Sequence, residues 1–138
     1  TALEKAGAAL KEAGAKRVLP LKVSGPFHSS LMEPAASKLK QELLKVTISD
    51  LQIPYISNVT AQKVTDKQEI AGLLCEGIHS SVHWEQSVRY MIRQGVDTFV
   101  EIGPGRTLAG FMKKIDPAVT VKNVAVWEDV EKVVNELC

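Results

Sequence analysis

The chain has 138 residues, of which 45% are hydrophobic and 24% charged. This length and composition predict one folded domain or part of one, and exclude a disordered tail or a collagen-like repeat. Seventeen basic and sixteen acidic residues give a net charge of +1, so composition does not favour a nucleic-acid partner. No apolar run approaches the roughly 18 residues that span a membrane. With two cysteines far apart, Cys75 and Cys138, we expect a soluble cytoplasmic protein with reduced thiols.

The predicted elements alternate between helices and strands. In chain order the patterns predict a helix at 1–13, an edge strand at 16–23, a helix at 31–46, a strand at 53–57, helices at 70–78 and 85–94, a strand at 98–102, a helix at 106–115, a strand at 121–126 and a helix at 127–137. Pro20 makes the first strand an edge strand or an interrupted one. Strands separated by helices are typical of a mostly parallel, helix-covered sheet, so the predicted fold class is α/β. The chain starts inside a helical pattern, so we expect it to come from something longer, unless Thr1 and Glu4 cap that helix.

The segment Ser24–Ser30, with the sequence SGPFHSS, joins a predicted strand to a predicted helix. A stiff Gly-Pro turn can hold the ring of His28 in place. Imidazole takes up and releases protons near neutral pH, so His28 is a candidate for proton transfer. The alternative is that His28 only fills the turn before a helix cap formed by Ser29 or Ser30.

Residues 101–107, with the sequence EIGPGRT, follow a predicted strand and lead into a helix. Ligands gather at such strand ends, and a glycine-rich helix N-terminus can receive an anion. The pattern of a phosphate-binding loop is absent, however, and a tight turn is the simpler interpretation.

Two patterns limit the chemistry of the chain. One possible set of metal ligands on a helix is suggested by the spacing of Cys75, His79 and His83. Residues 80–82 interrupt the helical pattern, however, so we expect the three side chains to diverge and predict no metal site. No GxSxG motif is present, so a serine-dependent hydrolase or transferase could not be complete on this chain.

Four segments carry a family resemblance: VSGPFHSSLMEPAASKLKQEL, ISNVTA, SSVHWEQSVRYM and VDTFVEIGPGRTLAGFMKKI. They resemble the C-terminal half of malonyl-CoA:acyl carrier protein transacylases, and the similarity also covers the first helix. The resemblance implies that residues 24–138 are the C-terminal part of the large, α/β-hydrolase-like core domain. It also implies that residues 1–23 are the last helix and strand of a ferredoxin-like small subdomain.

The resemblance implies a transfer in two steps. A serine takes malonyl from coenzyme A and passes it to the phosphopantetheine thiol of acyl carrier protein, in fatty acid biosynthesis. His28 matches the histidine that removes the serine proton and returns it to the departing thiol. The other ring nitrogen is oriented in this family by a main-chain carbonyl, here at Gly77 where glutamine is usual, with backbone support around Asn58. Phe27 is similar to the bulky residue of malonyl-selective members.

The resemblance also implies what the chain does not carry. The serine, the oxyanion loop and the arginine that pairs with the malonyl carboxylate belong to the N-terminal half of the family. We therefore expect a complementary N-terminal half as a partner, besides malonyl-CoA and acyl carrier protein, and expect neither a metal nor a tightly bound cofactor. The alternatives are a fragment of a polyketide synthase acyltransferase domain, and a non-catalytic module that binds acyl carrier protein through Arg106, Lys113 and Lys114.

Overall fold

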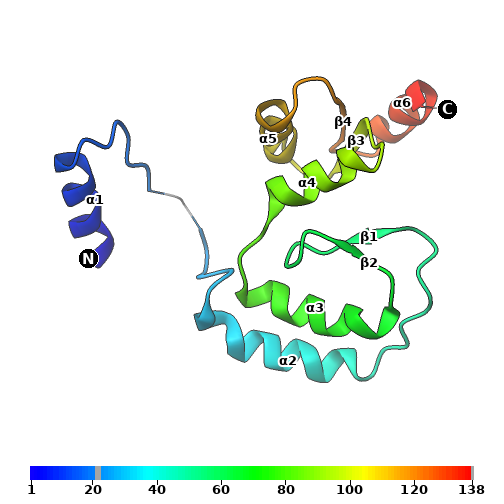
Figure 1. The fold of residues 1–138 in the computed structure, drawn as a ribbon, viewed down its shortest axis with the longest axis horizontal. Coiled ribbons are helices and arrows are strands. Elements are labelled where there is room, and N and C mark those ends of the chain that lie inside the picture. The colour runs from blue at the N-terminus through cyan, green and yellow to red at the C-terminus, as the bar shows by residue number, and fades with distance from the viewer. Residues whose placement is uncertain (21–22, 138) are drawn as a thin grey trace.

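The computed structural model describes residues 1–20 and 23–137 (Figure 1). The elements are the helix α1 (Ala2–Glu12), the short 3-10 helix η1 (Ser30–Met32), the helix α2 (Glu33–Leu43), the strands β1 (Tyr55–Ile56) and β2 (Lys63–Val64), the helices α3 (Lys67–His79) and α4 (Trp84–Arg93), the strand β3 (Thr98–Ile102), the helix α5 (Thr107–Ile115), the strand β4 (Thr120–Val124) and the helix α6 (Glu128–Leu137). The chain is thus of the mixed α/β class.

The elements pack into two groups (Figure 1). One group contains η1, α2, α3 and the β1–β2 hairpin, and the other contains α4, α5, α6 and the β3–β4 pair. Within the described part of the chain, two elements in extensive contact are always members of the same group. A short segment from Ser80 to His83 joins α3 to α4 and therefore connects the two groups.

The first group is built on two neighbouring helices. Pro34 lies in the first turn of α2, where a missing N–H does no harm. The side chain of Asp66 caps α3 by accepting a hydrogen bond from the N–H of Gln68 at 2.8 Å. The hairpin packs on α3 through β2 and buries Ala61 and Val64.

The second group contains a parallel strand pair with a helix between the strands. β3 and β4 pair in parallel from Thr98 opposite Thr120 to Ile102 opposite Val124. The connection between them is α5, which gives a β-α-β unit. The apolar residues buried here come from three helices: Val88, Ala109, Met112 and Val133.

One predicted strand is wrong, and a second is shorter and paired differently than expected. In the range 16–23, the described residues 16–20 and 23 form no strand, while Leu21 and Lys22 lie outside the described residues. A strand needs a hydrogen-bonding neighbour, and Pro20 offers no donor to one. In the range 53–57, only β1 is a strand, and it pairs antiparallel with β2 because the turn 57–61 reverses the chain. Among the described residues the expected parallel sheet is therefore two strands, beside a separate hairpin.

α1 lies apart from both groups in Figure 1. Thr1 and Glu4 form a capping box at its start, and none of its residues is buried. Val18 comes back onto this helix, since a Cβ placed on Gly7 would lie 3.4 Å from Cγ1 of Val18. The expected domain division after residue 23 stays a prediction.

The chain exposes an unusually large surface for its size. Its solvent-accessible area is 10722 Å² at a mass of 15.0 kDa, whereas a folded monomer of this mass exposes about 7,000 Å². The observed area is thus about half as large again as this expectation. Large apolar side chains contribute to it, including Ile102 at 80% and Trp127 at 83% exposure. Among the residues that the structure describes, every helix is too short or too polar to cross a bilayer.

We predict that Asp66→Ala lowers the free energy of unfolding by about 1 kcal/mol, because the first turn of α3 loses its cap. Asp66→Asn is the control, since an asparagine side chain can accept the same bond. Urea unfolding of the three proteins measures the difference. Equal stability of the alanine and asparagine variants would show that the cap does not stabilise α3.

Candidate functional site

His28 occupies a turn in which its backbone is held by a hydrogen bond to the end of α3. Its φ angle is 60°, in the left-handed region that non-glycine residues rarely adopt. Such a conformation costs about 1–3 kcal/mol and persists only where the surroundings hold it. Here the N–H of His28 donates a 3.0 Å hydrogen bond to the carbonyl oxygen of Ile78, near the end of α3. The turn is thereby attached to a helix that lies fifty residues further along the sequence.

The ring of His28 is oriented by main-chain carbonyls. Its Nδ1 lies 3.0 Å from the carbonyl oxygen of Gly77 and 3.1 Å from that of Ser80. Both partners are acceptors, so Nδ1 carries the proton and the lone pair of a neutral ring is on Nε2. The side chain is exposed, and none of the described hydrogen bonds involves Nε2. The ring therefore presents a free proton acceptor at its outer edge.

These carbonyls are available because a helix ends here. The last four carbonyl groups of an α-helix have no partner within the helix. The carbonyl of Glu76 accepts from the N–H of Ser80, while those of Gly77 and Ile78 accept from the ring and the backbone of His28. The end of α3 therefore supplies main-chain acceptors for both the ring and the backbone of His28.

Phe27 lies beside His28 and is exposed at 56%. Its ring folds back over Gly25, where an added Cβ would lie 3.4 Å from Cε2 of Phe27. The hydroxyl of Ser29 donates to the carbonyl of Pro26 at 2.6 Å and makes no capping bond to η1. The expectation that Ser29 caps the next helix is therefore wrong, because its hydroxyl closes the turn that carries His28.

Asn58 lies in the β1–β2 hairpin, and its contact with the site is made by its backbone. Its carbonyl oxygen accepts a 2.9 Å hydrogen bond from the N–H of His83. His83 follows Ser80 in the segment that leads into α4, where its own carbonyl accepts from the hydroxyl of Ser87. The hairpin thus contacts the segment that contains one of the two acceptors of the His28 ring. Residue patterns contained no signal for Ser80 or His83 in this role, because main-chain atoms make these bonds.

The EIGPG segment is a turn fixed by Glu101. The carboxylate of Glu101 accepts from the N–H groups of Leu108 at 3.1 Å and Ala109 at 2.9 Å, in the first turn of α5, and from Nδ2 of Asn123 at 2.8 Å. The N–H of Ala109 is the main cause that lowers the pKa of Glu101; desolvation opposes it, and the bonds from Leu108 and Asn123 lower the pKa further. The carboxylate already occupies the donors that a bound anion would use, so the structure favours the tight-turn interpretation.

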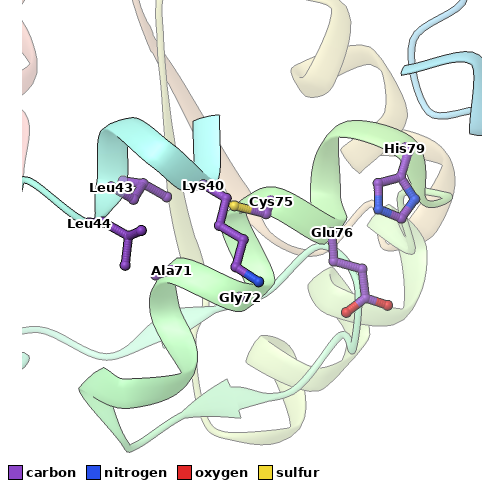
Figure 2. Close-up of a pocket in the computed structure, with 8 residues that line it drawn as sticks. All are labelled: Lys40, Leu43, Leu44, Ala71, Gly72, Cys75, Glu76 and His79. Atoms are coloured by element: carbon purple, nitrogen blue, oxygen red, sulfur yellow. The ribbon is translucent and has the colours of Figure 1, made fainter. Parts of the chain in front are cut away.

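Cys75 and His79 line an apolar cavity of about 310 Å³ between α2 and α3, as Figure 2 shows. His83 does not line it, because the chain leaves the helix at Ser80 with an extended backbone. In the described part of the chain, no three metal-ligating side chains come together. Lys40 and Glu76 also line this cavity.

The cations considered for carrier-protein binding do not form one patch. Arg106 precedes the first turn of α5, whereas Lys113 and Lys114 are in its last turn, about 12 Å further along the helix axis. All three are exposed. Arg106 faces Asp129 of α6, whose pKa is lowered mainly by the N–H of Ala125, with Arg106 as a minor contributor.

The fold and the site together describe a mixed α/β chain. It contains a histidine whose ring is oriented by main-chain carbonyls so that Nε2 can accept a proton. The Bacillus subtilis (strain 168) malonyl CoA-acyl carrier protein transacylase is 45% identical over 135 residues, which are 98% of this chain and 43% of that protein. The crystal structure of MCAT from Streptococcus pneumoniae matches with a TM-score of 0.86 and 41% identity, covering 98% of this chain and 44% of that one. A malonyl-transacylase solved in complex with a type II polyketide synthase acyl carrier protein matches with a TM-score of 0.86 and 36% identity, covering 98% and 44%. No protein-family model matches the sequence.

Over nearly its whole length, the chain matches part of the malonyl CoA-acyl carrier protein transacylases. It spans less than half of the length of the relatives that it matches. The resemblance noted from the sequence is therefore confirmed.

We predict that the pH dependence of stability changes in Glu101→Gln. A lowered pKa means that the ionised carboxylate stabilises the fold fully above the ordinary pKa of glutamate, and that this stability is lost as the pH falls through the lowered value. Urea unfolding between neutral and acidic pH should show a smaller loss for the variant. Glu4, Asp129 and Glu136, whose pKa values are also lowered, contribute equally to both proteins. Parallel pH curves would contradict the role of Glu101.

We predict that Gly77→Ala keeps the site intact and raises the free energy of unfolding by up to about 1 kcal/mol, because alanine favours the helix. An added Cβ would meet Cγ2 of Val59 at an ordinary 3.8 Å, and the carbonyl that His28 uses is unchanged. Gly105→Ala is the contrasting variant. Its φ of 93° strains any side chain, so stability should fall by about 1–2 kcal/mol. Thermal or urea unfolding measures both, and a destabilised Gly77→Ala would contradict the prediction.

Proposed function

We propose that this chain is the part of a malonyl-CoA:acyl carrier protein acyltransferase that supplies the general base, His28. The observation that carries the proposal is the pair of carbonyl oxygens, at 3.0 and 3.1 Å from Nδ1, which leaves Nε2 as the proton acceptor. Similarity to the transacylases supports the class of reaction. The nucleophilic serine is expected in the part of these relatives that the chain does not span.

The reaction proposed for the assembled protein has two transfers, and Nε2 acts in both. In the first, Nε2 takes the serine proton while the serine oxygen attacks the malonyl carbonyl carbon. The carbon–sulfur bond then breaks, and the coenzyme A thiolate receives the proton from Nε2. In the second, the phosphopantetheine thiol gives its proton to Nε2 and its sulfur attacks the carbonyl carbon of the seryl ester. The carbon–oxygen bond of the ester then breaks, and the serine oxygen takes the proton back from Nε2. One group can act as base and acid in turn because Nδ1 stays bonded to carbonyls throughout.

Phe27 and Gly77 are proposed to adjust this chemistry. Phe27 is exposed beside His28, so its ring can limit which acyl group approaches Nε2 and so favour unbranched malonyl. Gly77 supplies its carbonyl without a side chain, so the backbone alone orients the ring. Neither role involves a metal or a bound cofactor, since the coenzyme A thioester is itself the substrate.

The partners proposed are acyl carrier protein and a complementary polypeptide that contains the serine. The malonyl-transacylase crystallised with its acyl carrier protein supports the first. The exposed surface supports the second partner. The solvent-accessible area of the chain is about half as large again as that of a folded monomer of the same mass, and a second polypeptide could cover this excess. We propose that the assembled protein acts in cytoplasmic fatty acid biosynthesis, as its bacterial relatives suggest.

The test is to combine the chain with the N-terminal portion of a relative and follow malonyl transfer from coenzyme A to acyl carrier protein. His28→Ala should lower kcat by several powers of ten, because removing a triad-type base removes most of the chemical acceleration. His79→Ala is the matched control, since that ring lies on the α2–α3 cavity and should leave the rate unchanged.

Full activity of His28→Ala would reject the proposal. Salt-sensitive binding of acyl carrier protein with no thioester exchange, in the unsubstituted complex, would instead favour the alternative of a non-catalytic binding module.

A further inference from the structure

The family resemblance implies one carbonyl, at Gly77, as the group that orients His28, yet Nδ1 has a second acceptor. The carbonyl oxygen of Ser80 lies 3.1 Å from Nδ1, almost as close as that of Gly77 at 3.0 Å. The two acceptors have different origins. Gly77 is inside α3, whereas Ser80 is the first residue beyond it and has an extended backbone, with φ −94° and ψ 159°. Its carbonyl is therefore not placed by the geometry of the helix alone.

The segment that contains Ser80 is held at both ends. At its start, the N–H of Ser80 donates to the carbonyl of Glu76 at 2.9 Å. At its end, the N–H of His83 donates to the carbonyl of Asn58 at 2.9 Å, and the carbonyl of His83 accepts from the buried Ser87. Only residues 81 and 82 separate the two anchored positions. With both ends fixed, so short a segment leaves the Ser80 carbonyl little freedom to turn away from the ring.

The turn that supplies the Asn58 carbonyl is itself rigid. Ser57 is 1% exposed, its hydroxyl accepts from the N–H of Val59 at 3.2 Å, and its carbonyl accepts from the N–H of Ala61 at 2.8 Å. Ala61 is buried and has a φ of 54°, a conformation that the surroundings must hold in place. The hairpin therefore presents the Asn58 carbonyl from a fixed position.

We propose that the β1–β2 hairpin turn positions His28 through a backbone chain: the Asn58 carbonyl holds the His83 N–H, which fixes the Ser80 carbonyl that shares the Nδ1 proton with Gly77. Ser80, His83 and Ser57 are thus positioning residues, and the first two act through main-chain atoms. The inference deepens the proposed function, because the orientation that it explains is that of the proposed base. It also accounts for the exposed ring keeping one orientation.

The direct readout is the tautomer of the His28 ring in ¹⁵N NMR spectra, recorded above the titration range of histidine on the 138-residue chain. We expect the Nδ1–H tautomer to dominate. His83→Pro deletes the N–H that bonds Asn58. It should therefore lower the ratio of the Nδ1–H to the Nε2–H tautomer about fivefold, the equivalent of one neutral hydrogen bond of about 1 kcal/mol.

Ser81→Pro is the matched control, with a proline in the same segment. No hydrogen bond described for this chain uses the Ser81 N–H, and Ser80 already has the extended backbone that precedes a proline. This variant should keep the ratio of the unsubstituted chain. Should His83→Pro fail to fold by circular dichroism, Ser57→Ala replaces it, because loss of the hydroxyl that accepts from Val59 loosens the turn. It should shift the ratio in the same direction.

Each outcome supports or overturns the proposed positioning of His28, and none depends on a measurement of acyl transfer. A folded His83→Pro with an unchanged ratio would overturn the proposal, as would an equal shift in Ser81→Pro. If His83→Pro does not fold, an unchanged ratio in Ser57→Ala overturns it. A dominant Nε2–H tautomer in the unsubstituted chain would overturn it at its first step. None of these measurements needs substrate or the serine, so the proposed function is tested independently by His28→Ala.

Discussion

The structure depends on the hydrogen bonds between the end of α3 and His28. A helix leaves its last carbonyls without partners, and here the ring and the backbone of one histidine take two of them. This exchange satisfies the helix and holds a left-handed residue in its turn. The same bonds decide the chemistry, because a ring whose Nδ1 faces carbonyls can only accept a proton at Nε2. The stability of this turn and the chemistry proposed for His28 therefore have one physical origin.

This origin explains why sequence patterns led to the site but did not describe it. The Gly-Pro turn before His28 and the family resemblance pointed to His28 and to Gly77. The second acceptor at Ser80 and its connection to Asn58 through His83 are made by main-chain atoms, which every residue has, so no side-chain pattern marks them. The left-handed φ of His28 could not be predicted either, since it depends on a carbonyl fifty residues away.

The elements show the same division between local and distant causes. The helices and β3 were predicted to within a few residues because their apolar spacing is local. The prediction for 16–23 was wrong because a strand exists only where a neighbour pairs with it. The prediction for 53–57 missed the partner strand β2, because its two residues, Lys63 and Val64, are too few to show a strand pattern in the sequence. For residues 101–107 the sequence favoured a tight turn but gave no sign that the carboxylate of Glu101 itself serves as the anion for α5.

The two packed groups suggest how such a site keeps its geometry in a chain with so much exposed surface. The turn of His28 and its acceptors belong to the group of α2, α3 and the hairpin, or to the segment that leaves it. Large apolar side chains are exposed in both groups, including Leu31 in the first and Ile102 in the second. The orientation of the proposed base is thus set by bonds within one small unit. A partner that covers the exposed faces would have to bring the serine to a ring that is already aimed.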